Sequence, residues 1–134
     1  MKRIPPEEME REYVTQVYDE IAGHFAHTRN RPWPEVRKFV NELPPYSLVL
    51  DLGCGNGRNL RACRHVIDMG TDYSLPLCKI ALKRKRPIFR STALDIPIRD
   101  CTFDSVICIA VIHHFASKER RVQCLREISR ILKV

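Results

Sequence analysis

The 134-residue sequence has no pair of cysteines spaced as Cys-x-x-Cys and no apolar run of 18 uncharged residues. The first absence removes the usual ligand pairs of a zinc site, so no metal site is expected. The second excludes a transmembrane helix, and no membrane partner is expected. The N-terminal run MKRIPPEEMEREY has no apolar signal core, so secretion is not expected either. The six cysteines are therefore predicted to be reduced, mostly buried thiols in a cytoplasmic or nuclear protein.

Low-complexity segments and internal repeats are also absent, and the composition is that of an ordinary globular domain. The sequence is 44% hydrophobic and 29% charged, and its length fits a single structural unit with a real core. Its 23 lysine and arginine residues outnumber the 16 acidic residues, which gives a formal net charge of +7. This excess suits a polyanionic partner such as nucleic acid.

Residues 1–46 are predicted to form a helical segment. Apolar side chains recur every four residues between positions 6 and 28, which predicts one helix whose apolar face is formed by Met9, Tyr13, Val17, Ile21 and Phe25. Pro32 and Pro34 interrupt this period, and Pro34 is suited to the first turn of a second helix. Pro44 and Pro45 are expected to end that second helix.

Residues 47–134 are predicted to form a Rossmann-like α/β unit. Short apolar runs predict a strand beginning at Leu48 and three more at 65–71, 87–92 and 103–109, with helical stretches at 58–64, 75–85 and 118–133. Strands that alternate with helices indicate a parallel sheet with helices on both faces, here with four strands. The fourth strand is expected to leave an edge unpaired unless another element covers it.

A glycine-rich turn carries the strongest chemical signal in the sequence. The run DLGCGNG at 51–57 follows a predicted strand and precedes a predicted helix. Glycines there permit positive φ and a close approach of the backbone to a ligand, which is expected above the carboxyl end of the strand. A dinucleotide fingerprint would need a glycine at position 58, where the sequence has Arg58, so a nicotinamide-dependent oxidoreductase is disfavoured. A turn with a purely structural purpose is the other alternative.

The acid and glycines of this turn, in the pattern D-x-G-x-G-x-G, resemble motif I of class I S-adenosylmethionine-dependent methyltransferases. The resemblance runs from Leu48 to Val134 and implies S-adenosylmethionine as the cofactor. Asp72, at the end of the second predicted strand, is then expected to accept hydrogen bonds from both ribose hydroxyls. A role in a turn or a helix cap is the alternative for Asp72.

Two later segments extend the resemblance. The runs ALDIP at 93–97 and FDSVI at 103–107 resemble the adenine-side loop and the fourth-strand motif of the same superfamily. The acid that this superfamily places near the adenine amino group aligns with Thr92, and the nearest carboxylate is Asp95. The cofactor-binding residues implied by the resemblance are Asp51, Gly53, Gly55, Gly57, Asp72, Thr92, Ala93, Leu94 and Ile109.

The flanks carry a narrower resemblance. TQVYDEIAGHFAHTRNRPWPEV at 15–36 and IAVIHHFASKERRVQCLREISRIL at 109–132 are similar to the eukaryotic tRNA wobble-uridine carboxymethyl methyltransferases, a family that includes the methyltransferase domain attached to an AlkB-type hydroxylase. The resemblance implies methylation of the carboxylate of 5-carboxymethyluridine in the anticodon loop. It also implies a small zinc-binding activator subunit that pairs with a sheet edge, for which the strand at 87–92 is the candidate.

The same resemblance raises an alternative function. Full members of the family continue with further strands, so the sequence is expected to be C-terminally truncated relative to them. A non-catalytic form that binds RNA or a protein partner is therefore the alternative to an active enzyme.

The implied reaction needs few catalytic groups. A carboxylate is already an anion at neutral pH, so no general base is required and catalysis is largely the alignment of two reactants. Arg29 can fork onto the carboxylate, and of the paired histidines His113 and His114 the second is predicted to face the substrate. A solvated loop charge is the alternative for Arg29. The basic run at 83–86 is either a solvated helix end or a contact with tRNA phosphates.

Overall fold

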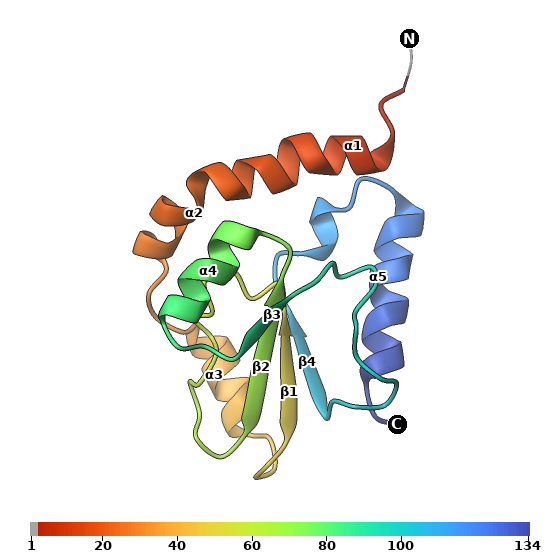
Figure 1. Ribbon diagram of the computed structural model, residues 1–134. Helices are drawn as coiled ribbons and strands as arrows, with labels where there is room; N and C mark the ends of the chain where they lie inside the picture. The colour runs from red at the N-terminus through yellow and green to blue at the C-terminus, as the bar shows by residue number, and fades with distance from the viewer. Residues whose placement is uncertain (1–2) are drawn as a thin grey trace.

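A four-stranded parallel sheet forms the centre of the protein in a computed structural model that describes residues 3–134 (Figure 1). Its strands are β1 (Leu48–Leu52), β2 (Ile67–Asp72), β3 (Ile88–Arg90) and β4 (Ser105–Cys108), in the order β3-β2-β1-β4. All three pairings are parallel, as the alternation of strands and helices predicted. The four predicted strands are therefore confirmed, although each is shorter than its apolar run.

The helices occupy most of the predicted stretches. They are α1 (Pro6–Glu10), α2 (Gln16–Thr28), α3 (Pro34–Asn41), α4 (Leu75–Lys83) and α5 (Lys118–Ile131), with a π-helical segment at Arg11–Thr15 and a 3-10 turn at Ile112–His114. The helix predicted at 58–64 is wrong, because this segment consists of turns. Arg61 there has a φ of 57°, and its N–H donates to Asp68 Oδ2 (2.7 Å) instead of to a helical carbonyl. No helix within residues 3–134 is long and apolar enough to cross a membrane.

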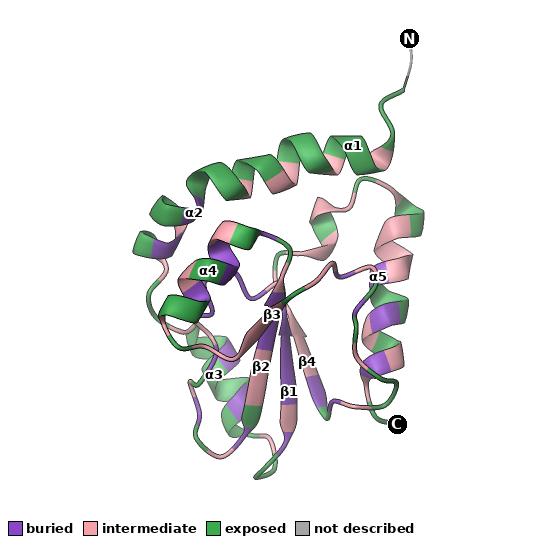
Figure 2. Ribbon diagram, viewed as in Figure 1, coloured by how far each residue is buried: buried purple, intermediate pink, exposed green. Residues whose placement is uncertain are grey.

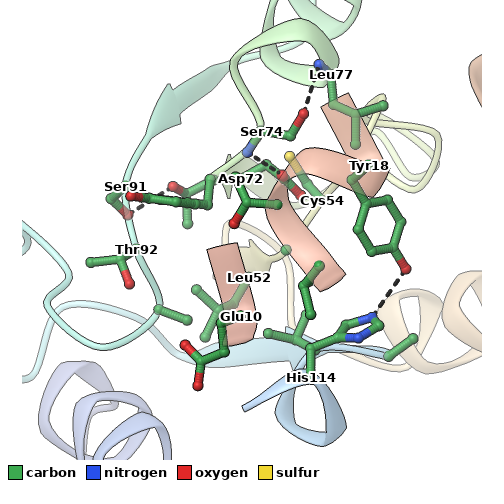
Figure 3. Close-up of a pocket in the computed structure, with 18 of the residues that line it drawn as sticks. Glu10, Tyr18, Leu52, Cys54, Asp72, Ser74, Leu77, Ser91, Thr92 and His114 are labelled. Atoms are coloured by element: carbon green, nitrogen blue, oxygen red, sulfur yellow. Dashed lines mark hydrogen bonds between the residues drawn. The ribbon is translucent and has the colours of Figure 1, made fainter. Parts of the chain in front are cut away.

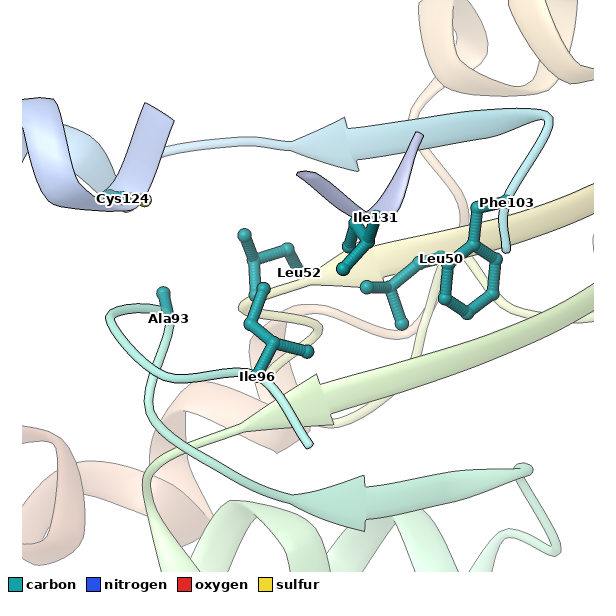
Figure 4. Close-up of a cluster of buried hydrophobic side chains, with 7 residues drawn as sticks. All are labelled: Leu50, Leu52, Ala93, Ile96, Phe103, Cys124 and Ile131. Atoms are coloured by element: carbon teal, nitrogen blue, oxygen red, sulfur yellow. The ribbon is translucent and has the colours of Figure 1, made fainter. Parts of the chain in front are cut away.

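Both faces of the sheet are covered by apolar side chains. In β1, Leu50 and Leu52 point to one face, where they pack with Ala93, Ile96, Phe103, Cys124 and Ile131 under α5 (Figure 4). Val49 points to the other face and packs with Val36, Val40, Cys63 and Val66, which places α3 there. This alternation, buried on both sides, explains why β1 is a continuous apolar run in the sequence. All six cysteines are free thiols, and four of them are buried.

The strand order fixes where a ligand would lie. Strands β2 and β3 extend the sheet on one side of β1, and β4 pairs with the other side of β1. The order in which strands are added therefore switches sides between β1 and β4, while all strands remain parallel. Such a switch point opens a crevice beyond the carboxyl ends of the strands. The glycine-rich turn after β1, the end of β2 and the segment after β4 all meet at that crevice.

The N-terminal helix crosses above these strand ends, and its predicted apolar face is wrong. Met9, Tyr13, Val17 and Ile21 are 40–61% exposed, and only Phe25 of that set is partly buried. Most of the ribbon of α1 and α2 is accordingly coloured as exposed in Figure 2. The inward side instead carries Glu10, Val14, Tyr18, Ala22 and Ala26. The π-helical segment Arg11–Thr15 lies in the middle of this helix, and its wider turn changes the register of the residues on either side. Four-residue spacing therefore identified the helix and missed the side that packs.

The long loop between β3 and β4 is held to α5 by one arginine and one glutamate. Ile96 N–H donates to Glu127 Oε2 (2.7 Å), and Arg130 donates to the carbonyls of Ile96 (2.8 Å) and Ile98 (2.7 Å). Arg130 also pairs with Glu127 (2.8 Å), and this pairing keeps the pKa of the largely buried Glu127 below its ordinary value. The loop thereby brings residues 92–94 to the crevice in a fixed position.

Replacing Arg130 with alanine should lower the free energy of unfolding by about 3 kcal/mol, because it leaves the Glu127 carboxylate buried and unpaired and removes two bonds to loop carbonyls. Urea denaturation measures this change. Arg126→Ala is the matched control, since Arg126 is exposed on the same helix and forms no ion pair within residues 3–134. Equal midpoints for the two variants would contradict this role of Arg130.

Candidate functional site

A cavity of about 1240 Å³ lies between the carboxyl ends of the strands and the N-terminal helix (Figure 3). Its walls come from the glycine-rich turn, the ends of β2 and β3, the segment after β4 and the inward side of α1 and α2. This volume exceeds the range of roughly 300–1,000 Å³ that holds one drug-sized ligand. The cavity therefore has room for a cofactor and part of a second reactant.

The glycine-rich turn adopts the conformation that its sequence predicted. Gly53, Gly55 and Gly57 have φ values of 78°, 57° and 76°, which only glycine adopts without strain. A Cβ on Gly53 would overlap Val111 Cγ2, so no larger residue fits there. Gly53 lines the cavity, whereas Gly55 and Gly57 do not: a Cβ on Gly55 would face the Phe25 ring (3.3 Å), and one on Gly57 would face Arg86 Cγ (2.9 Å). These two glycines allow close packing behind the turn.

Asp72 ties the turn to β2. Its Oδ2 accepts a hydrogen bond from Gly55 N–H (2.8 Å), and its Oδ1 accepts one from Ser74 N–H (2.9 Å). The structural role that the sequence left open is thus present, since Ser74 in turn caps α4 through Leu77 N–H (3.4 Å). Asp72 also lines the cavity, and burial raises its pKa although these amide donors oppose the shift. A carboxylate has about four acceptor positions, so Asp72 retains capacity for hydroxyl donors.

Asp51 is a buried carboxylate with a free oxygen. Its side chain is 4% exposed, and its Oδ2 has no hydrogen-bond partner among residues 3–134. Burial raises the pKa of Asp51 to about 7, with Asp72 and Asp68 adding to the shift and Arg58 opposing it. A buried acceptor left unsatisfied costs about 1–3 kcal/mol. Because Asp51 lines the cavity, a cationic or hydrogen-bonding ligand there would remove that cost.

The segment after β3 supplies the far wall of the cavity. Thr92, Ala93 and Leu94 line it, and Ile109 lines it from the segment after β4. Thr92 Oγ1 accepts a hydrogen bond from Leu94 N–H (3.2 Å), which shapes this short loop. Asp95 is exposed and lies outside the cavity lining, so of the two candidates near the adenine position only Thr92 faces the cavity.

The predicted substrate-binding residues, Arg29 and His114, lie at the two ends of a row of contacting side chains. The Arg29 guanidinium lies 4.1 Å from the Phe25 ring centroid, Phe25 contacts Tyr18 edge-on (5.7 Å), and Tyr18 contacts His114 edge-on (5.3 Å). Tyr18 Oη and His114 Nε2 are also hydrogen-bonded (3.0 Å). His113 is not among the cavity-lining residues. Burial, together with His113, lowers the pKa of His114, so its imidazole is neutral at pH 7.

Several residues of the site escaped the sequence analysis. Asn56, between two of the glycines, is 1% exposed, and its amide donates to the backbone carbonyl of Arg29 (2.8 Å). Glu10 accepts two bonds from Arg120 (2.8 and 2.7 Å) and one from Ala116 N–H (2.8 Å), which holds α1 to the start of α5. For Asn56, the only signal in the sequence was its position between two glycines. Glu10 and Arg120 are 110 positions apart and carried no signal at all.

Among residues 3–134, no group of three or more histidine, cysteine, aspartate or glutamate side chains is placed to hold an ion. The thiol of Cys54, in the glycine-rich turn, has its pKa raised by burial, so it stays protonated at neutral pH.

A family profile described as "Methyltransferase domain" matches residues 50–134, which begins in β1 and includes the glycine-rich turn, Asp72 and the loop at 92–94. The chain belongs to this methyltransferase family. The resemblance to methyltransferases is confirmed, and the sheet with its helices is the fold of that family.

Curated relatives extend the similarity across the N-terminal helix. The chain is 48% identical over 125 residues to the tRNA (carboxymethyluridine(34)-5-O)-methyltransferase alkbh8 of Xenopus tropicalis, covering 93% of this chain and 20% of the relative. It is 45% identical over 125 residues to the tRNA (carboxymethyluridine(34)-5-O)-methyltransferase of Schizosaccharomyces pombe, covering 93% of this chain and 54% of the relative. The chain thus spans between a fifth and about half of the length of these two relatives.

Solved structures share the fold. One chain of the complex between the Haloferax volcanii Trm112 methyltransferase activator and a methyltransferase matches with a TM-score of 0.71 and 25% identity, covering 87% of this chain and 55% of that one. An S-adenosylmethionine-dependent methyltransferase structure from Methanococcus maripaludis matches with a TM-score of 0.66 and 22% identity, covering 99% of this chain and 63% of that one. The second similarity extends through the N-terminal helix as well as the sheet.

Proposed function

We propose that the chain is the cofactor-binding and methyl-transferring unit of a tRNA methyltransferase that esterifies the carboxylate of 5-carboxymethyluridine at the wobble position. The observation that carries this proposal is one shared cavity lined by two groups of residues: Asp51, Asp72 and the glycine-rich turn form the first group, and Arg29 and His114 form the second. The similarity to the named tRNA carboxymethyluridine methyltransferases supports the choice of substrate.

The first group of lining residues fits S-adenosylmethionine. Asp72 would accept the ribose hydroxyls, Thr92 to Leu94 would contact the adenine, and the free oxygen of Asp51 would face the cationic methionyl end. Gly53 has no side chain, so its backbone packs closely against Val111, and both residues line the cavity. When bound, this cofactor supplies a methyl group on a sulfonium, which a carboxylate accepts without further activation.

The second group of lining residues, Arg29 and His114, fits an anionic substrate group. Arg29 forms no ion pair within residues 3–134, and its guanidinium lies over the Phe25 ring. Its Nη1 donates to Thr28 Oγ1 (3.0 Å), and its remaining donors are available for a carboxylate. Neutral His114, fixed by Tyr18, adds one hydrogen-bonding group without a second full charge. One guanidinium and one neutral imidazole orient the substrate carboxylate without stabilising the bound substrate so strongly that it reacts more slowly.

Replacing Arg29 with alanine should lower kcat/KM for methyl transfer about 100-fold, since a charge-assisted contact to the substrate carboxylate is lost. The affinity for S-adenosylmethionine should stay within about twofold, because the proposal assigns the Arg29 side chain to the substrate carboxylate. Initial rates and calorimetry measure the two effects. Arg64→Ala is the control, since Arg64 is exposed in the turn before β2, at the other end of the strands. A parallel loss of rate and cofactor affinity would contradict this assignment of Arg29 to the substrate.

Transfer of a labelled methyl group from S-adenosylmethionine to an anticodon stem-loop tests the proposed reaction. The stem-loop with 5-carboxymethyluridine should gain label as an alkali-labile ester, and the same stem-loop with uridine should gain none. Cofactor and RNA binding without transfer would favour the alternative, a non-catalytic binding module. Binding of NADH in place of S-adenosylmethionine would favour an oxidoreductase.

A protein partner belongs to the same proposal. Strand β3 lies at one edge of the sheet and pairs only with β2 within residues 3–134, so its outer edge is open for strand addition. We place a small zinc-binding activator subunit there, in keeping with the Trm112 activator complex among the similar structures. Co-expression should raise the soluble yield, and equal yields with and without the subunit would count against it.

We place the protein in the cytoplasm, and in the nucleus as well.

A further inference from the structure

One corner of the cavity carries two guanidinium groups and an indole that the proposed methyl transfer does not fully use. These belong to Arg29, Arg58 and Trp33. We propose that Arg58 and Trp33 form a subsite for single-stranded RNA beside the methylated nucleotide, in which Arg58 binds a backbone phosphate and Trp33 stacks on a neighbouring base. This inference rests on the proposed function, because it deepens the recognition of the same RNA.

The two guanidinium groups in this corner are not held in ion pairs. Neither Arg29 nor Arg58 forms an ion pair within residues 3–134, and each guanidinium lies on an aromatic ring instead: Arg29 on Phe25 (4.1 Å) and Arg58 on Trp33 (4.7 Å). The pKa of Arg58 is lowered by burial and by the nearby Arg29, whereas Asp51 acts in the other direction. Two close cations without a bound carboxylate favour an anionic ligand.

The indole is rigid and open on the surface. Trp33 stands between Pro32 and Pro34, and its backbone N–H donates to Asn59 Oδ1 (3.0 Å), which fixes the main chain from which the indole projects. The backbone before it is fixed as well, because Asn56 donates to the Arg29 carbonyl (2.8 Å). The side chain is nevertheless 39% exposed. A rigid aromatic ring beside a cation is the combination that binds single strands, in which bases stack and phosphates follow a positive groove.

The most basic segment of the sequence is a poorer candidate for this contact. Arg84 donates to the Ala26 carbonyl (3.1 Å) and to Asn30 Oδ1 (3.0 Å), so it closes the end of α2. Arg86 packs beside Gly57, behind the glycine-rich turn. Two of the four residues in the run at 83–86 thus have structural contacts, and neither lines the cavity. Arg58 combines a free guanidinium with a position at the cavity.

Trp33 is the only tryptophan in the sequence, so intrinsic fluorescence reports this subsite directly. The experiment titrates the 134-residue chain with the anticodon stem-loop, with and without the carboxymethyl group, and follows tryptophan emission together with anisotropy of labelled RNA. We expect RNA to quench the emission. Arg58→Ala should weaken both RNAs equally, about 10-fold, and should reduce the slope of log affinity against log salt by about 0.7. Trp33→Ala should weaken binding about 10-fold and leave that slope unchanged.

The controls separate this subsite from general charge and from the cofactor site. Arg64→Ala should bind within about twofold of the unmodified protein, and Arg58→Lys should keep the salt slope even if Arg58→Ala proves unstable. RNA binding without quenching, or an Arg58→Ala protein that binds like the Arg64 control, would overturn the proposal. So would a loss confined to the carboxymethyl RNA, since Arg58 would then hold the base carboxylate. These titrations contain no S-adenosylmethionine, so failure to bind that cofactor, measured separately, would count against the proposed function alone.

Discussion

Replacing Asp51 with asparagine will stabilise the ligand-free protein at pH 8 and will weaken its binding of S-adenosylmethionine about 100-fold. Asparagine keeps the shape of the side chain and removes a carboxylate that is 4% exposed and has one unpartnered oxygen. The loss of affinity follows because the proposed function sets this carboxylate against the cationic end of the cofactor, and a hydrogen bond to a charged group contributes about 1.5–3 kcal/mol. Thermal denaturation without ligand and calorimetry with S-adenosylmethionine measure the two effects.

The pH dependence of unfolding gives a second result for the same variant. Burial raises the pKa of Asp51 from 3.8 in the unfolded chain to about 7, so between these values the folded state holds a proton that the unfolded state has released. Stability from this group is therefore greatest at low pH and falls as the pH rises, by about 3 kcal/mol between pH 5 and pH 8. The Asp51→Asn protein should lose that decline. An unchanged pH profile, or a less stable variant at pH 8, would show that Asp51 is not a buried strained carboxylate.

Replacing Asp72 with alanine will weaken the binding of S-adenosylhomocysteine about 100-fold and will abolish its preference over the 2′-deoxy analogue. Asp72 accepts hydrogen bonds from Gly55 and Ser74, so alanine also disturbs the glycine-rich turn. That disturbance affects both ligands equally, whereas loss of a bond to the ribose hydroxyl affects only the ligand that has it. The loss of affinity caused by Asp72→Ala is therefore compared between the two ligands, and the difference between the two losses measures the direct contact with the ribose hydroxyl.

Asp95→Ala is the matched control for that experiment, because Asp95 is a carboxylate near the same wall that is exposed and does not line the cavity. Its affinity for both ligands should stay within about twofold of the unmodified protein. An Asp72→Ala protein that still distinguishes the two ligands as before would show that Asp72 only supports the turn.

The parts of the fold that depend on local sequence were predictable. The apolar run of β1, the glycines after it and the prolines around α3 each determine their own conformation, so the sheet, the turn and the beginning of α3 followed from the sequence. The packed side of the N-terminal helix did not follow, because its apolar residues Met9, Tyr13, Val17 and Ile21 face solvent and a π-helical segment changes its register. A period of four residues contains no information about which side meets the rest of the protein.

The half of the site formed by distant residues was also beyond the sequence. Tyr18 meets His114 across 96 positions and Asp19 meets Ser74 across 55, and no local pattern marks either pair. These contacts, with Glu10 and Arg120, hold the N-terminal helix over the cavity. The resemblance to a family supplied Arg29 and His114 as candidates, and the structure adds the edge-on ring contacts through Phe25 and Tyr18 that join them.

Calorimetric titration of the chain with S-adenosylmethionine tests the central claim most directly. A single site with measurable heat is expected, with competition by S-adenosylhomocysteine and an affinity that rises between pH 6 and pH 8 as Asp51 loses its proton. Absence of heat at any pH in that range, with no competition by the product, would contradict the assignment of this cavity to the methyl donor.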